Sequence, residues 1–148
     1  VLAPVSGQML ALSDVDDGCS HGLPGVGFAI QPSDGRLYAP FDGTVRFTFS
    51  TKHTLGIVSE DGLETMIRVG LGTVNLRGEG FTTYYQDGQL VHAGDLLMTF
   101  DRDLIKQSGY DDVVVTFFTQ PGRITDQTTD WPETIQHGQA ATTVTFKA

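Results

Sequence analysis

The stretch that decides the fold is YAPFDGTVRFTF, residues 38–49. An alanine–proline pair leads into a turn that closes on Gly43, and apolar residues then alternate with threonine and arginine over residues 44–49. Alternation with a period of two is typical of a half-buried β-strand. Because proline cannot donate a ladder hydrogen bond, the strand that follows it is expected to start at a sheet edge.

The same pattern occurs twice more in the chain. APVSGQM at residues 3–9 repeats the alanine–proline pair, the turn that ends in glycine and the strand. DGQLVHAGDLL at residues 87–97 contains a turn, a strand, a second turn and a second strand. Repeated turn–strand units predict a fold that is built from related β elements.

Short strands between glycine turns continue through the rest of the chain. It has 18 glycines and 6 prolines, and runs of β-branched or aromatic residues lie at 25–30, 113–118 and 141–146. We therefore predict an all-β fold, an antiparallel β-sandwich or barrel-like arrangement of short strands with Greek-key or duplicated turn–strand units. One or two short helical turns are expected, at 101–107 with Asp101 as N-cap and at 82–86.

Size and charge limit the classes of function. The 148 residues fit a single domain over 1–148, and 9 basic against 18 acidic residues give a net charge of −9. This charge argues against nucleic acid and anionic membrane surfaces as partners. The single cysteine, Cys19, allows no disulfide within the chain, which fits a cytoplasmic location. No apolar stretch approaches the roughly 20 residues of a membrane span, so we expect no membrane insertion of this domain.

The ordered set of segments resembles the glucose-type IIA domain of the bacterial phosphoenolpyruvate:sugar phosphotransferase system. The matching segments are APVSG (3–7), YAPFDGT (38–44), TKH (51–53), VGLGTV (69–74), LRGEGF (76–81), DGQ (87–89) and GDLLMTFD (94–101). The resemblance implies a β-sandwich that carries a phosphoryl group. Such a domain takes the group from the histidine-containing phosphocarrier protein and passes it to the IIB and IIC domains of a sugar permease.

The resemblance also implies a site on one shallow face. His53 stands where the family has its supporting histidine, and Thr51 where it has a helper threonine. The position of the phosphoacceptor histidine holds Arg68. A guanidinium has no free nitrogen lone pair and stays charged, so it cannot accept a phosphoryl group. It can bind a phosphate or carboxylate in a bidentate fork, and its charge should lower the pKa of His53.

Partner docking is expected to change with the site. Two aspartates that border the face in the family are replaced here by Val26 and Gly72. Apolar residues assigned to the docking face either form an exposed partner patch or pack inside their strands; these are Phe28, Phe49 and Leu71. The resemblance gives the histidine-containing phosphocarrier protein and the IIB/IIC domains as partners, with docking weakened.

Two functions therefore stay open. One is a IIA domain whose standard histidine phosphotransfer is impaired or lost unless His53 takes the phosphoryl group. The other is a non-catalytic regulatory module that binds an anion through Arg68, His53 and Thr51. Neither needs a cofactor or a metal. A zinc peptidase of related β architecture is disfavoured, because the chain has no His-x-His pair to build the metal site.

Overall fold

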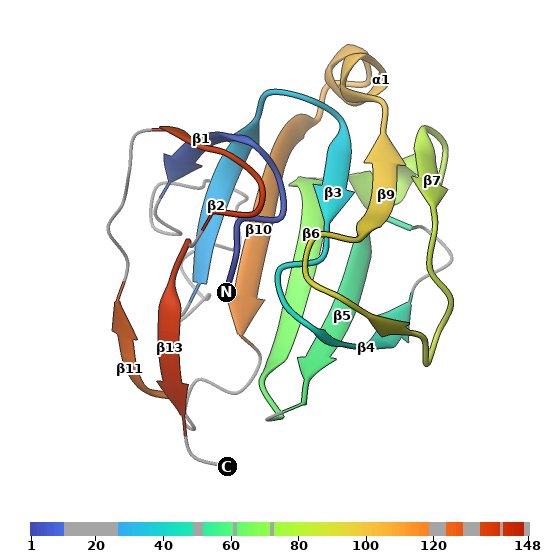
Figure 1. The fold of residues 1–148 in the computed structure, drawn as a ribbon. Coiled ribbons are helices and arrows are strands. Elements are labelled where there is room, and N and C mark those ends of the chain that lie inside the picture. The colour runs from blue at the N-terminus through green and yellow to red at the C-terminus, as the bar shows by residue number, and fades with distance from the viewer. Residues whose placement is uncertain are drawn as a thin grey trace.

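Antiparallel strands form nearly all of the regular structure in the computed structural model (Figure 1). It describes residues 1–10, 27–48, 52–60, 62–71, 73–118, 124–128, 134–139 and 141–146. The strands are β1 (Gly7–Leu10), β2 (Gly27–Pro32), β3 (Arg36–Tyr38), β4 (Gly43–Thr48), β5 (Thr54–Ser59), β6 (Glu64–Leu71), β7 (Phe81–Thr83), β8 (Leu90–Val91), β9 (Leu96–Phe100), β10 (Asp111–Phe118), β11 (Ile124–Thr128), β12 (Thr134–Ile135) and β13 (Thr143–Phe146).

These strands form one large sheet and two small ones. The large sheet has eight strands in the order β12-β1-β2-β10-β6-β5-β4-β8, and β3-β9-β7 and β11-β13 form the others. In Figure 1 the three-stranded sheet lies in front of β6, β5 and β4. Buried side chains of both sheets belong to one core cluster, including Leu37 and Met98 on one side and Ile57 and Ile67 on the other. The predicted antiparallel β-sandwich is confirmed.

Helical structure is short, and one predicted turn was wrong. The helix α1 (Arg102–Gln107) begins after Asp101, whose side chain accepts a hydrogen bond from the Leu104 amide as predicted. Residues 82–86 form no helical turn, because Thr82 and Thr83 continue the strand β7 and pair with β9. A further helical turn among the described residues is η3 (Thr73–Leu76). Within the described part of the chain, no helix has the length and apolar character needed to cross a bilayer.

The repeated turn–strand units exchange equivalent backbone hydrogen bonds where they meet. The Leu2 amide donates to the Pro40 carbonyl at 2.8 Å, and the Tyr38 amide donates to the Pro4 carbonyl at 2.7 Å. Each copy then pairs its first strand with a two-residue strand, β1 with β12 and β4 with β8. Those two-residue strands are the edges of the large sheet, so β1 and β4 lie second from its edges.

The turns that follow the two edge strands repeat the same bonds. Ala3 donates to the Gln139 carbonyl and Ala39 to the Asp95 carbonyl, both at 2.8 Å. In return, Gly138 donates to the Ala3 carbonyl and Gly94 to the Ala39 carbonyl, at 3.0 and 2.9 Å. The expected duplication is therefore present in the backbone. It also relates the turns around Gly94 and Gly138, which the sequence pattern did not match to each other.

Candidate functional site

Cross-strand pairing places Arg68 in a row of residues that crosses five strands. The row runs from Leu10 on β1 through Ala29, Val115 and Arg68 to Thr54 at the start of β5. Directly opposed residues of an antiparallel sheet present their side chains on the same face. Arg68 therefore lies at the junction between an apolar half of this face and the segment that carries His53.

The apolar half of the row is dry. Ala29, Val113 and Val115 are 0 %, 2 % and 3 % exposed and form a small cluster on the face opposite the main core, with Leu10 and Phe117 packed against it. On the other side of Arg68, Thr54 is also buried. Charges interact more strongly beside buried apolar groups than in water, because less solvent screens them. A half-buried arginine in this position is well suited to hold an anion.

The His53 backbone is fixed against β6. Its carbonyl accepts a hydrogen bond of 2.7 Å from the Val69 amide, so His53 lies beside the Arg68–Val69 peptide. The preceding residue, Lys52, has a φ of 62° and is exposed. A left-handed backbone in a residue other than glycine costs about 1–3 kcal/mol, and such strain is common at functional sites. The strained Lys52 determines how the chain enters β5 at His53.

The electrostatics of His53 agree with the sequence prediction in direction. Burial, and after it the charge of Arg68, lowers the pKa of His53 below its usual value of 6.5. The imidazole is therefore neutral at neutral pH, and a neutral imidazole has one donor and one acceptor nitrogen. A guanidinium beside it offers only donors. Together they can bind a phosphate by charge-assisted hydrogen bonds, while Arg68 itself cannot be phosphorylated.

Gly70 is the next-to-last residue of β6, the strand that carries Arg68. Its φ is +81°, and a Cβ atom there would come within 2.4 Å of Thr73 Cγ2 and 2.8 Å of the Asp111 carbonyl oxygen. The Thr73 hydroxyl donates to the Val69 carbonyl at 2.6 Å and is fully buried. The turn after β6 is thus held by a glycine that no larger residue can replace without strain.

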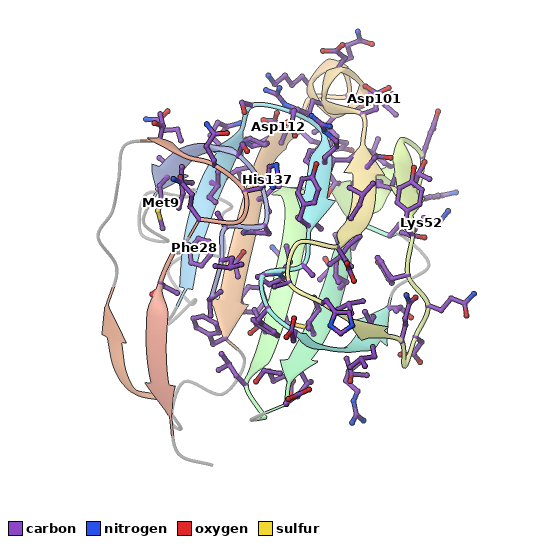
Figure 2. The ribbon with its side chains drawn as sticks, in the orientation of Figure 1. Met9, Phe28, Lys52, Asp101, Asp112 and His137 are labelled. Atoms are coloured by element: carbon purple, nitrogen blue, oxygen red, sulfur yellow. The ribbon has the colours of Figure 1, made fainter. Side chains whose placement is uncertain are left out.

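Several predicted site residues cannot be placed. Thr51, Phe49, Val26 and Gly72 lie outside the described residues, and Leu71 is described only as the last residue of β6, opposite Asp111. Phe28 is described, on β2 (Figure 2), and it is 0 % exposed within the main core. Of the two alternatives given for Phe28, packing in the interior therefore holds, because a ring buried in this way has no surface for a partner.

Sequence reasoning missed the residues beside Arg68. Ala29 and Val115 lie in the same cross-strand row as Arg68, and Lys52 has a left-handed backbone directly before His53. A signal for the first two was present, because the unbroken apolar run 113–115 indicates a strand that is buried on both faces. Which of its residues lies opposite Arg68 depends on strand register, which one sequence does not reveal.

Comparisons with known proteins agree with this fold. The family described as phosphoenolpyruvate-dependent sugar phosphotransferase system, EIIA 1, matches residues 1–124. The lactose permease of Lactobacillus helveticus is 53% identical over 148 residues, which are 99% of this chain and 23% of that protein. The lactose permease of Leuconostoc lactis is 49% identical over 148 residues, 100% of this chain and 23% of that protein.

Two further similarities extend the comparison. The raffinose carrier protein of Pediococcus pentosaceus is 46% identical over 138 residues, 93% of this chain and 21% of that protein. Among solved structures, the glucose permease IIA from Mycoplasma capricolum superposes with a TM-score of 0.81 at 31% identity, covering 96% of this chain and 93% of that one. The chain thus spans less than a quarter of the length of the curated relatives it matches.

Proposed function

We propose that this chain, which belongs to the EIIA 1 family of the phosphoenolpyruvate-dependent sugar phosphotransferase system, is a regulatory domain of a sugar permease that binds an anion at the position that the family resemblance gives to the phosphoacceptor histidine. The domain extends over residues 1–148 and works on the cytoplasmic side of the permease. The names of the relatives support this assignment, because they are lactose permeases and a raffinose carrier protein.

The observation that carries the proposal is Arg68 at the centre of β6, flanked by the buried Val115 and Thr54 and beside His53. A relay nucleophile must offer a lone pair to phosphorus and later leave it, which imidazole does and guanidinium does not. The permanently charged guanidinium of Arg68 at this position holds a phosphate group by electrostatic attraction. The domain would then respond to a phosphate group by binding it, without being phosphorylated itself.

Docking of the phosphocarrier protein should be weakened for an electrostatic reason. The family's acidic border is replaced by Val26 and Gly72, and Arg68 adds a positive charge. A basic partner therefore meets a less negative local surface, although the whole chain keeps a net charge of −9. Such changes act mainly on the association rate and on its dependence on salt.

Intact-mass measurement after incubation with phosphoenolpyruvate, enzyme I and the phosphocarrier protein tests the lost relay. We expect the wild-type domain to stay unmodified and Arg68→His to gain one phosphoryl group. An inert Arg68→His domain would show that docking has been lost as well. A wild-type domain that becomes phosphorylated would overturn the proposal.

Rerouted phosphorylation is the second candidate, and the neutral state of His53 favours it. An imidazole nitrogen of His53 would form a bond to phosphorus while the phosphorus–nitrogen bond in the phosphocarrier breaks, and the carrier's imidazole would leave with the electron pair. In that case His53→Ala abolishes phosphorylation of the otherwise wild-type chain. His92→Ala, at an exposed histidine on another turn, is the matched control.

Anion binding is measured separately with inorganic phosphate as the probe. Amide NMR signals of β5 and β6 around His53 and Arg68 should shift and saturate, and Arg68→Ala should remove the effect. Arg36→Ala, at an exposed arginine on β3 of the other sheet, should leave it intact. A phosphate response that survives Arg68→Ala would place the anion elsewhere.

A further inference from the structure

An open groove lies at one edge of the large sheet, where the strands are β12, β1 and β2. Its volume is about 410 Å³, and its lining residues are Gly7, Gln8, Gln31, Ser33, Thr134, Ile135 and Gln136. Volumes of this size are within the range of small-molecule sites, which is roughly 300–1,000 Å³. Neither His53 nor Arg68 lines it, so the groove is separate from the site described above.

The lining is rich in amides, and none of its described residues has an ionisable side chain. Gln8, Gln31 and Gln136 each carry a carbonyl oxygen and an NH₂ group, so together they supply both acceptors and donors. The apolar member, Ile135, is 2 % exposed because it packs into the main core. The described residues of the groove therefore offer hydrogen bonds without a charged side chain.

One of these amides is held in place by a buried carboxylate. Gln31 Nε2 donates to Asp112 Oδ1, and Asp112 is 1 % exposed. The other oxygen of Asp112 accepts from Arg102 Nε at 2.8 Å and lies 3.7 Å from Lys106 Nζ. Figure 2 shows Asp112 close to α1, which carries both cations. A side chain that is fixed before a ligand arrives loses less entropy on binding.

The internal duplication provides a comparison for this groove. In the other copy, Thr44 takes the place of Gln8, since each follows the turn glycine and pairs with the first residue of its edge strand. Val58 takes the place of Gln31 as the partner on the neighbouring strand, and His92 takes the place of Gln136 after the edge strand. The fold therefore builds the equivalent corner of the other copy without glutamines.

We propose that this groove binds a neutral, hydroxyl-rich small molecule of the size of a mono- or disaccharide. A hydroxyl group can donate a hydrogen bond to an amide oxygen and accept one from an amide NH₂ group. A neutral ligand suits this groove because its described lining residues carry no charge. The inference does not rest on the anion site.

The test is an NMR titration of the amide-labelled domain with glucose, galactose and lactose. We expect saturable shifts at residues 7, 8, 31 and 134–136 with a dissociation constant in the millimolar range, about −4 kcal/mol at 1 mM. Exchanging the groove residues for those of the other copy, Gln8→Thr with Gln136→His, should weaken binding at least about tenfold, because it removes two hydrogen-bonding amides.

Two controls separate this outcome from misfolding. The reverse exchange in the other copy, Thr44→Gln with His92→Gln, should leave sugar affinity unchanged, and thermal unfolding of each variant reports on folding. The proposal is overturned if no sugar produces a saturable shift up to about 0.1 M, a concentration at which even a very weak site would respond. It is also overturned if the Gln8→Thr, Gln136→His variant shows the same sugar-induced shifts and the same affinity as the wild type. Phosphate binding at Arg68 is unaffected by either result.

Discussion

At the scale of residues, His53 gives the site its dependence on pH. Burial first and the Arg68 charge second lower its pKa below 6.5 in the folded chain. Above 6.5 the imidazole is neutral whether the chain is folded or not, so stability does not change with pH through this group. As the pH falls from about 6.5 through the lowered folded pKa, the unfolded chain takes the proton first, and the free energy of unfolding decreases.

Removing the neighbouring charge should shift this titration. In Arg68→Ala we expect the pKa of His53 to rise only part of the way to its usual value, because burial is the larger cause and remains. NMR titration of the ring protons measures the change, with Arg36→Ala as the control. A pKa that stays the same or falls in Arg68→Ala would contradict the coupling between the two side chains.

Gly70 allows a second test at this scale. Gly70→Ala should lower the free energy of unfolding by roughly 2–4 kcal/mol, because a left-handed alanine must also displace Thr73 or the Asp111 backbone. Gly109 has a similar φ of +88°, and a Cβ atom there would meet nothing within 4 Å, so Gly109→Ala should cost only about 1 kcal/mol. Urea unfolding compares them, and equal losses would mean that the contact at Gly70 relaxes freely.

At the scale of elements, α1 is attached to the large sheet through Asp112. Arg102 lies 2.8 Å from this carboxylate with its side chain 26 % exposed, and Lys106 lies 3.7 Å away and is 54 % exposed. Loss of the nearer cation leaves a buried carboxylate with less compensation. We expect Arg102→Met to cost about 3 kcal/mol and Lys106→Met less than about 1 kcal/mol, measured by urea unfolding. The opposite order would show that the lysine holds α1.

At the scale of the whole molecule, the two copies are joined where their first segments cross. The amides of Leu2 and Tyr38 make equivalent bonds, to Pro40 and Pro4. Separating the copies breaks both bonds, so native-state hydrogen exchange should give the two amides opening free energies that agree within about 1 kcal/mol. Much faster exchange of Leu2 would mean that the first residues fray independently of the crossing.

The sequence predicted much of this architecture because its signals are local. The alternation in residues 44–49, the glycine turns and the capping Asp101 each act within a few residues of themselves, and β4 and α1 appear close to where they are expected. The helical turn predicted at 82–86 was wrong because threonine favours strands, and Thr82 and Thr83 pair with β9.

The candidate site was predictable in part for a different reason. His53 and Arg68 were brought together by a family resemblance. Burial is the larger cause of the lowered His53 pKa and was not predicted, whereas the smaller contribution, from the Arg68 charge, was. The neighbours Ala29 and Val115 depend on the register of three strands, and Phe28 depends on which face of β2 points inward. Both are properties of long-range pairing, which local patterns do not fix.

The two-residue strands at the margins of the large sheet have a consequence for self-association. An exposed, long edge invites another chain to add a strand, and this is a common start of aggregation. Here β8 and β12 each offer two residues, and each is followed at once by a tight turn with a left-handed glycine, Gly94 or Gly138. Neither margin of the large sheet therefore offers a neighbouring molecule a long strand to pair with, even at high protein concentration.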